Sequence, residues 1–271
     1  MHVNVPSNVD RAIEQLSINI NPIEFSRLLG IEPFDWQREL LLSEDPRCLC
    51  NCSRQSGKSE VASIMALHTA LTKPGSLIVM VAPSLRQSSL LFRRTYDHWR
   101  DLGKPYGAEI ETALSLVLGN HSKIYAVPSG RDGSNIRGFS NVSMLVIDEM
   151  SRCTDALITA VRPFLARSMG RLIGISTPNG RRGQFYELFE KGGDAYRRWL
   201  VTAYDVGIDP TFLETERSAL GESFFSAEYL CSFNALETAV FDWDDVEAAS
   251  TDVTEEFHAL DYKMKFTAKP V

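Results

Sequence analysis

Eight residues, CSRQSGKS at positions 52–59, carry the strongest structural signal in this sequence. Gly57, Lys58 and Ser59 match the end of the phosphate-binding pattern G-x-x-x-x-G-K-[ST], whereas Cys52 stands where that pattern has its first glycine. The first glycine usually makes a tight turn, so Cys52 fits only if the loop starts with ordinary backbone dihedrals. The neighbouring sequence therefore has to show whether this is a true phosphate-binding loop.

The residues after the loop have the pattern of a helix. The stretch RQSGKSEVASIMALHTALTKPG, residues 54–75, predicts a loop and then a helix that opens at Ser59 and ends at Pro74-Gly75. Apolar residues recur at helical spacing on its expected inner face: Val61, Ile64, Met65 and Leu67 or Leu71. A phosphate-binding loop requires this succession of strand, loop and helix.

Short apolar runs alternate with amphipathic stretches along much of the chain. Four of these runs read as strands: residues 47–52, 76–82, 143–148 and 170–176. Strands and helices in this order build a parallel sheet. The pattern predicts an α/β fold, namely a P-loop NTPase core of the ASCE, RecA-like type, with three layers and a mostly parallel central sheet. Two β-rich runs between Glu109 and Val127 flank Gly119-Asn120 and predict an inserted hairpin.

The charge of the chain divides it into two parts. The 271 residues carry a net charge of −7, which argues against a nucleic-acid partner. Residues 1–200, however, hold 24 Lys and Arg against 20 Asp and Glu, whereas residues 201–262 hold one Arg against 15 acids. We therefore expect a core with an N-terminal helical extension in residues 1–203, and a helical lid with an acidic linker in residues 204–271.

Composition also indicates the cellular class. Hydrophobic residues make up 44% of the chain, which is enough for a packed core in one large domain. The N-terminal MHVNVPSNVD lacks the pattern of a signal peptide, and the apolar runs are too short to cross a bilayer. We expect a soluble cytoplasmic protein without a membrane partner. Cys48, Cys50 and Cys52 alternate along one strand, so we expect small buried residues beneath the loop rather than a zinc site.

A second motif offers an independent test of the loop. In SMLVIDEM, residues 143–150, four apolar residues run into Asp148 and Glu149, at the strand end where ligands of open α/β sheets bind. Lys58 would then contact the β- and γ-phosphates, Ser59 and Asp148 would hold magnesium, and Glu149 would polarise the attacking water. The plainer interpretation, a strand end with solvated acids, fits either motif alone but explains their joint occurrence poorly.

Two further features agree with a nucleotide site. The amide of Gln37 in PFDWQREL can pair with the N6 and N7 edge of adenine, although a surface glutamine on a helix is the plainer alternative. In GISTPNG, residues 174–180, Ser176 and Thr177 follow the next strand and could sense the γ-phosphate, although the segment is also compatible with an ordinary turn.

These elements in this order resemble the ATPase domain of the large terminase subunit, the motor that packages DNA into the heads of tailed phages. The loop CSRQSGKS resembles that family's variant of the phosphate-binding loop, in which an arginine follows the serine and the first glycine is missing. MLVIDEM resembles its second motif with the catalytic glutamate, GISTPNG its coupling motif and GESFFSAEYLCSF the helical segment that closes the domain. The resemblance spans residues 34–242.

The resemblance implies a role for each matching residue. Arg54 corresponds to the loop arginine that senses or stabilises the γ-phosphate, and Arg137 to the arginine inserted into a neighbouring subunit's site; which of the two is the principal finger stays open. The remaining implied roles are adenine binding by Gln37, ATP binding by Ser53, Arg54, Gln55, Ser56, Gly57, Lys58 and Ser59, magnesium binding by Ser59 and Asp148, catalysis by Lys58 and Glu149, and coupling to movement by Ser176, Thr177 and Pro178.

The resemblance also implies partners. An ATP-hydrolysing motor of this kind would drive double-stranded DNA into a procapsid at the portal, in the cytoplasm of the infected host. It would be a ring-shaped homo-oligomer when assembled and a monomer when free, and would meet the portal and the small terminase subunit. Large terminases carry a C-terminal nuclease, and too few residues follow ALDYKMKF to fold one, so no DNA cleavage is expected. Either the chain is part of a longer protein, or the protein has no nuclease.

Contacts with DNA and the exact activity stay open at this point. Candidate phosphate contacts are Arg93, Arg94, Arg100, Arg181 and Arg182, and a solvated helix face is the alternative. One core lobe of a helicase-type translocase shares the upstream glutamine and the Asp-Glu pair. An ATP-binding scaffold without turnover is a third possibility, against which Glu149 argues.

Overall fold

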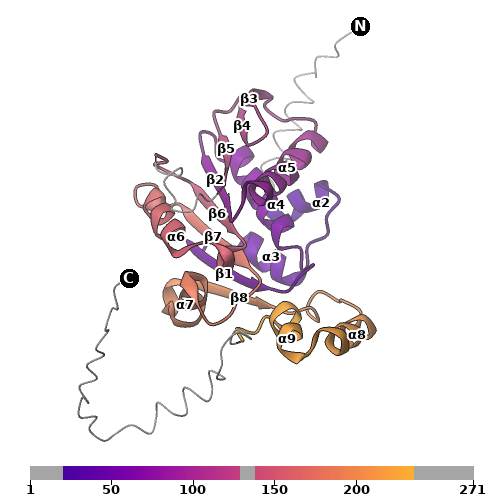
Figure 1. The fold of residues 1–271 in the computed structure, drawn as a ribbon. Coiled ribbons are helices and arrows are strands. Elements are labelled where there is room, and N and C mark those ends of the chain that lie inside the picture. The colour runs from indigo at the N-terminus through magenta and orange to yellow at the C-terminus, as the bar shows by residue number, and fades with distance from the viewer. Residues whose placement is uncertain (1–20, 129–137, 235–271) are drawn as a thin grey trace, which may run out of the picture. The chain divides into compact units, whose positions relative to one another are not determined.

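An eight-stranded sheet forms the centre of the computed structural model, which describes residues 21–128 and 138–234 (Figure 1). Its order is β3-β4-β5-β2-β6-β7-β1-β8. The strands are β1 (Arg47–Cys52), β2 (Leu77–Ala82), β3 (Ala108–Glu111), β4 (Ser115–Leu118), β5 (Lys123–Pro128), β6 (Met144–Asp148), β7 (Arg171–Ser176) and β8 (Arg197–Val201). All neighbours pair in parallel except β3 with β4 and β4 with β5.

The strand order brings the two predicted motifs to one edge of the sheet. β7 lies between β1, which precedes the loop, and β6, which ends in Asp148. In the parallel register Asn51 lies opposite Ser176, and Asp148 lies opposite Ile175. The loops that follow these three strands therefore leave the sheet side by side, where open α/β sheets bind ligands.

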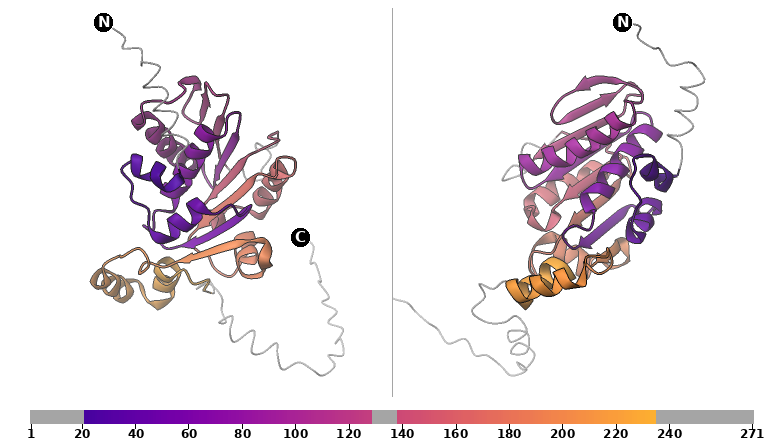
Figure 2. Two further views of the ribbon diagram at one scale, coloured as in Figure 1. Left: turned by 180° about the vertical axis from the view of Figure 1, so that it is seen from behind. Right: turned by 90° about the vertical axis from the view of Figure 1, so that its right-hand side faces the viewer.

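Helices cover both faces of the sheet (Figures 1 and 2). One face carries α2 (Pro22–Leu28), α3 (Asp35–Leu42), α4 (Lys58–Thr72) and α5 (Leu85–Asp101). The other face carries α6 (Asp155–Val161) and α7 (Gly183–Lys191), together with the 3-10 turns η2 (Met150–Arg152), η3 (Arg162–Leu165) and η4 (Gly193–Ala195). The predicted three-layer α/β fold is therefore correct.

Side chains of β1 point alternately to the two faces of the sheet, so this strand contributes to the hydrophobic core on each face. Cys48, Cys50 and Cys52 are fully buried on the side of α4, whereas Leu49 belongs to the core on the other face. The thiols are free, as expected of small buried residues beneath the loop. A side chain at Gly174 of β7 would displace packed residues, because a Cβ there would lie 2.5 Å from the Met150 sulfur.

The predicted turn at Gly119-Asn120 connects β4 and β5, which pair antiparallel. The hairpin is not a separate insertion, however, because β5 also pairs in parallel with β2 and so belongs to the central sheet. Together with β3 the hairpin extends one edge of that sheet.

The opposite edge is formed by β8, which the sequence did not reveal. Its residues RRWLV begin with two arginines, and only Trp199 and Val201 are buried. After β8 come α8 (Pro210–Leu220) and α9 (Glu222–Leu230), which share a small core of Ala203, Leu213, Phe225 and Tyr229. Within the two described stretches, none of the helices has the length and apolarity needed to span a bilayer.

Candidate active site

The loop between β1 and α4 has the backbone of a phosphate-binding loop. Cys52 is the last residue of β1 and has no positive φ, which meets the condition that its replacement of glycine imposes. The turn is made further on, where Gln55 has φ 59° and Gly57 has φ 77°. The conformation at Gly57 favours glycine, and a Cβ there would lie 2.5 Å from Gln37 Nε2, so a larger residue would also have to displace the Gln37 amide.

The loop presents unpaired donors. Among the described residues, the backbone N–H groups of Gln55, Ser56 and Gly57 have no backbone or side-chain acceptor. The first N–H groups of α4 are also free, because a helix leaves its first turn without partners. Within residues 21–128 and 138–234, the buried Ser53 hydroxyl has no hydrogen-bond partner either. Such a row of donors at a helix N-terminus is an anion site.

Lys58 adds a positive charge to this loop. Its ammonium group lies 3.5 Å from the Ser53 carbonyl oxygen and 3.9 Å from Glu149 Oε1. The side chain is 11% exposed, so its charge is only partly screened by water. Lys58 therefore links the loop to the carboxylates at the end of β6.

Asp148 at the end of β6 faces the start of α4. The Ser59 hydroxyl donates to Asp148 Oδ2 at 3.0 Å, and the Glu149 backbone N–H donates to Oδ1 at 2.9 Å. Burial, and secondarily the neighbouring Glu149 carboxylate, raise the pKa of Asp148 to about 6. A carboxylate whose ionised form is disfavoured in this way gains from a bound cation, and one carboxylate with one hydroxyl is the oxygen donor set that Mg²⁺ accepts.

Glu149 adopts a left-handed backbone conformation, with φ 48°. Non-glycine residues in this region are strained, and such residues concentrate at functional sites. Its Oε2 atom is buried without a hydrogen-bond partner in the described chain, and Arg152 Nε lies 3.6 Å away. A buried carboxylate oxygen without a donor is an acceptor that a water molecule can satisfy.

Lys58 and Glu149 line a pocket of about 570 Å³. It is lined by Arg54, Gln55, Lys58, Gln87, Glu149, Arg152 and Thr177. The structure thus brings together the two sequence motifs and the segment after β7.

The segment after β7 is hydrogen-bonded to the turn η2 that follows Glu149. The Ser176 hydroxyl accepts from the Ser151 backbone N–H at 3.0 Å, and the Ser151 hydroxyl donates to the Thr177 carbonyl at 2.7 Å. Thr177 lines the pocket, and Pro178 follows it in the chain. A displacement of η2 would therefore reach the segment directly; the coupling role of Ser176, Thr177 and Pro178 itself stays a prediction.

A comparison with known protein families shows which family this chain belongs to. The family described as terminase large subunit, T4likevirus-type, N-terminal, matches residues 49–266. The chain belongs to the large terminase family. The large terminase subunits of Thermus virus P23-45 and Thermus phage G20c are each 27% identical to it over 187 residues, a match that covers 62% of this chain and 38% of those proteins.

Solved large terminases have the same fold. The large terminase ATPase domain of Thermus phage P74-26 matches with a TM-score of 0.69 and 24% identity, over 79% of this chain and 100% of that one. The large terminase of a thermophilic bacteriophage in complex with ADP matches with a TM-score of 0.59 and 13% identity, over 78% and 57%. The terminase chain spans well under half the length of the curated relatives it matches.

Gln37 lies beside the loop, but its amide is already engaged. Gln37 Oε1 accepts from the Phe34 backbone N–H at 2.9 Å, and Nε2 donates to the Gly57 carbonyl at 3.1 Å. These bonds fix the start of α3 against the end of the loop. The adenine contact expected of Gln37 stays a prediction, and it would require the amide to use its remaining N–H or to exchange a partner.

Four contributors to this terminase site were missed in the sequence. Arg152 had a detectable signal, because an arginine three residues after Glu149 can reach it across one helical turn. Gln87 on α5 and Ser151 on η2 had no distinguishing pattern. Glu228 on α9 contacts Arg54 across 174 residues of sequence, a separation that no spacing rule addresses.

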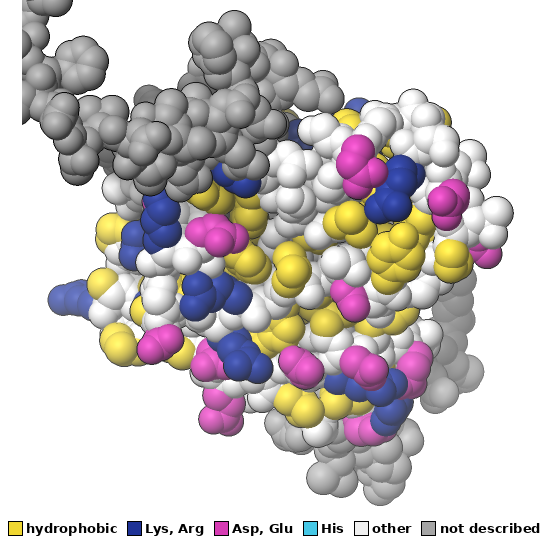
Figure 3. Space-filling model, turned by 90° about the horizontal axis from the view of Figure 1, so that it is seen from below, with side chains coloured by type: hydrophobic (Ala, Val, Ile, Leu, Met, Phe, Trp, Pro, Cys, Tyr) yellow, Lys and Arg dark blue, Asp and Glu magenta, His cyan; other side chains and the backbone are white. Residues whose placement is uncertain are grey.

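The arginines considered for DNA binding differ in what they already contact. Arg94 pairs with Glu60, and Arg100 with Asp97 and Asp101. The face shown in Figure 3 likewise intersperses basic with acidic side chains.

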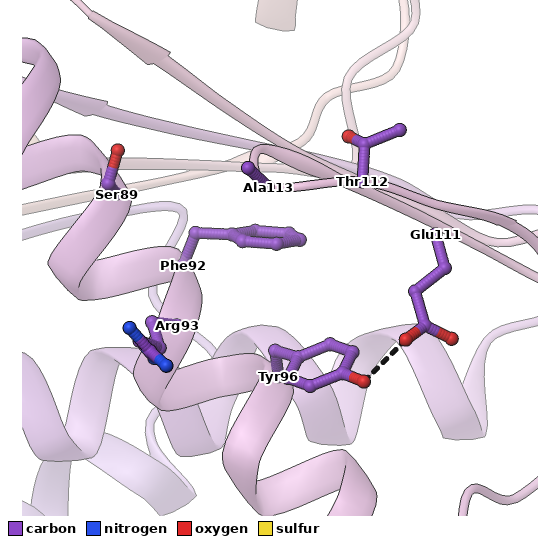
Figure 4. A pocket seen from close by; sticks show the side chains of 7 residues that line it. All are labelled: Ser89, Phe92, Arg93, Tyr96, Glu111, Thr112 and Ala113. Carbon is purple, nitrogen blue, oxygen red and sulfur yellow. Dashed lines mark hydrogen bonds between the residues drawn. The ribbon is translucent and has the colours of Figure 1, made fainter.

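Arg93 lines a second hollow, of about 530 Å³, in which Phe92 and Tyr96 of α5 face Glu111–Ala113 (Figure 4). Arg181 Nε donates to the Phe233 carbonyl at 3.0 Å, and Arg182 is exposed. Arg137 lies outside the described residues. DNA contact by the five arginines stays a prediction.

The raised pKa of Asp148 predicts a pH-dependent stability. The folded carboxyl, with a pKa of about 6, binds its proton more tightly than an unfolded aspartate, whose usual value is 3.8. Without metal, the free energy of unfolding should therefore rise as the pH falls through 6, and level off near 4. Asp148→Asn should remove this rise and stabilise the metal-free protein at pH 7 by about 1 to 3 kcal/mol.

Urea unfolding in a chelator at pH 5 and pH 7 measures both effects. Asp194→Asn, at an exposed aspartate, is the matched control and should follow the parent protein. An Asp148→Asn variant that keeps the parent's pH dependence would show that the Asp148 carboxyl does not cause it.

Proposed function

We propose that this domain binds and hydrolyses ATP and uses the reaction to drive double-stranded DNA into a procapsid. One observation carries the proposal: the two motifs meet, with the Ser59 hydroxyl 3.0 Å from Asp148 and the Lys58 ammonium group 3.9 Å from Glu149. Membership of the large terminase family supports the packaging role, and a related structure with bound ADP supports the choice of nucleotide.

Different residues of this site would bind the phosphates, activate the attacking water and stabilise the developing charge. The N–H groups of residues 55–57 and the start of α4 would hold the phosphates, with Lys58 at the β- and γ-phosphates. Glu149 would accept a hydrogen bond from the attacking water and later its proton, because its Oε2 has no other donor among the described residues. Arg54 and Arg152 would offset the charge that develops on the transferred phosphoryl group.

A magnesium ion fits the donor set of Ser59 and Asp148. When bound, such an ion supplies positive charge to the phosphate oxygens. Asp148 favours magnesium binding because burial penalises its ionised form, and Ser59 favours it because it lies in the first turn of α4, directly after Lys58.

The partners follow from the same proposal. Motor activity would require double-stranded DNA, the portal of the procapsid and the small terminase subunit, and would take place in the host cytoplasm. Arg137 would enter the site of the adjacent subunit in a ring, while the free subunit would be a monomer with slow turnover. Residues 204–271 would form the lid and linker of the motor.

Phosphate release with magnesium and ATP is the direct test. Lys58→Ala should weaken ATP binding by about ten- to a hundredfold, because it removes a largely buried charge facing the phosphates. Lys58→Arg keeps the charge and should lose less affinity. Lys191→Ala, at an exposed lysine on α7, controls for loss of charge alone.

Binding of labelled ATP and release of phosphate should be followed on the same samples. An unchanged affinity in Lys58→Ala would show that ATP does not bind in this loop. Tight ATP binding without any phosphate release in the parent protein would instead favour the alternative function, an ATP-binding scaffold without turnover.

A further inference from the structure

Gln87 lines the pocket from α5, and the division of roles proposed above leaves it unused. It is the third residue of this helix, which follows β2 after a short turn. β2 pairs in parallel with β6, and Val81 lies opposite Ile147, the residue before Asp148. The sheet order places β2 and β1 on opposite sides of β6, so Gln87 approaches the pocket from the side opposite to the phosphate loop.

The cap of α5 fixes the orientation of the Gln87 amide. The Ser84 hydroxyl accepts from the Gln87 backbone N–H at 3.3 Å and donates to Gln87 Oε1 at 2.8 Å. Because Ser84 occupies the amide oxygen, the end of the side chain that is left for other partners is Nε2, with two N–H groups. Neither N–H group has an acceptor in the part of the chain that the structure describes. Gln87 therefore offers the pocket donors only.

Two sets of contacts hold α5 in place. The buried Ser88 hydroxyl donates to the Val127 carbonyl of β5 at 3.1 Å. Further along the helix, Arg94 pairs with Glu60 in the first turn of α4, and His98 Nε2 lies 2.6 Å from Glu60 Oε1. The amide thus belongs to a helix that is attached both to the sheet and to the helix that follows the phosphate loop. Little conformational freedom is lost when a donor held in this way binds a ligand.

The chemistry of the pocket decides which acceptor such a donor meets. Lys58 and the two arginines of the pocket are donors themselves, and Glu149 is the acceptor proposed for the attacking water. That water attacks phosphorus with an oxygen lone pair, so a donor directed at the same oxygen would oppose the reaction. The transferred phosphoryl group carries three charged equatorial oxygens. One of these oxygens is the acceptor that suits a donor arriving opposite the loop.

We propose that Gln87 donates a hydrogen bond to the γ-phosphate of ATP and thereby makes the site distinguish ATP from ADP. This inference rests on the proposed ATP-binding function. ADP lacks the acceptor, so the Gln87 amide is left to water when ADP is bound. Because Gln87 belongs to α5, ATP connects this helix to the phosphate loop through the nucleotide, whereas ADP does not.

The test measures the affinities of Gln87 variants for a non-hydrolysable ATP analogue and for ADP. Gln87→Ala removes the donor, so the analogue should bind about tenfold more weakly, the range of a hydrogen bond to a charged group, while ADP affinity stays unchanged. Gln87→Glu keeps the acceptor for Ser84 but replaces the donor with a negative charge. It should therefore weaken the analogue more than Gln87→Ala does, and more than it weakens ADP.

Two further variants serve as controls. Leu90→Glu, at an exposed position of the same helix, adds the same charge outside the pocket and should alter neither affinity. Ser84→Ala releases the amide oxygen, so it should weaken the analogue in the parent protein but have no further effect in a Gln87→Ala background.

Equal losses for ADP and the analogue in Gln87→Ala, or no loss for either, would overturn the inference. Unchanged affinities with slower phosphate release would overturn it as well, because they would assign Gln87 to the attacking water. If melting curves show that Gln87→Ala is unfolded, Gln87→Met carries the same test, since it keeps the length of the side chain and lacks the donor. Failure of the parent protein to bind either nucleotide would refute the proposed function instead.

Discussion

Replacing Glu149 with glutamine is expected to leave ATP bound but to slow its hydrolysis by about 10² to 10⁴, the range that a positioned general base contributes. Glutamine preserves the volume and one oxygen but cannot take up the proton of the attacking water. The Lys58 contact with Ser53 and the Ser59–Asp148 hydrogen bond do not involve the Glu149 side chain, and the change removes only the 3.9 Å ion pair between Lys58 and Glu149, so nucleotide affinity should stay within about threefold of the parent.

Single-turnover phosphate release and binding of labelled ATP separate the two quantities. Glu187→Gln on α7, an exposed glutamate paired with Lys191, controls for the loss of one negative charge. Melting curves should show that Glu149→Gln is folded, since the strained backbone at φ 48° accommodates both residues alike. Hydrolysis at the parent rate would remove Glu149 from the role of base.

Arg137→Ala should abolish assembly-stimulated hydrolysis, with a loss of about 10³ to 10⁵ in rate, while the isolated subunit keeps its nucleotide affinity. The reason is that an arginine supplied by a neighbour offsets charge that develops only in the transition state. The stretch SGRDGSNIRGFS, rich in glycine, serine and asparagine, has the composition of an exposed loop and comes just before β6.

Aromatic contacts hold Phe139, which directly precedes the approach of the chain to β6. Phe139, two residues after Arg137, packs edge-to-face against Phe164 and at a tilt against Tyr125, with ring centroids 5.9 and 5.6 Å apart. The chain therefore enters β6 from an anchored aromatic cluster.

Mixed assemblies test whether Arg137 acts in trans. Arg137→Ala subunits have a complete site of their own, and Glu149→Gln subunits have an intact Arg137, so mixing the two should partly restore turnover. Arg131→Ala, in the same stretch, is the matched control and should retain stimulation. Mixed rings that assemble but remain inactive would exclude the trans role and make Arg54 the better candidate for the finger.

Much of the fold was predictable because its central strands are buried on both faces. β1, β2, β6 and β7 start within one residue of the predicted positions, since strands covered by helices on both sides read as continuous apolar runs bounded by polar residues. β8 was not predicted because it lies at the sheet edge, where only two residues of RRWLV are buried. Arg197 there stacks on Trp199 at 5.5 Å, a use of arginine that a pattern of apolar residues does not register.

The sequence alone determined the residues at the strand ends, Lys58, Ser59, Asp148 and Glu149. Asp148 ends the apolar strand β6 and Glu149 follows it, whereas Lys58 and Ser59 begin α4 after the short loop that follows β1. Parallel strands carry their C-terminal ends to one edge of the sheet, so local pattern implies proximity. The tertiary structure alone decided that Gln37 is engaged by Gly57 and that Arg54 is paired with Glu228, 174 residues away. Those contacts depend on how α3 and α9 pack against the ends of the sheet, and packing between distant segments leaves no periodic trace in the chain.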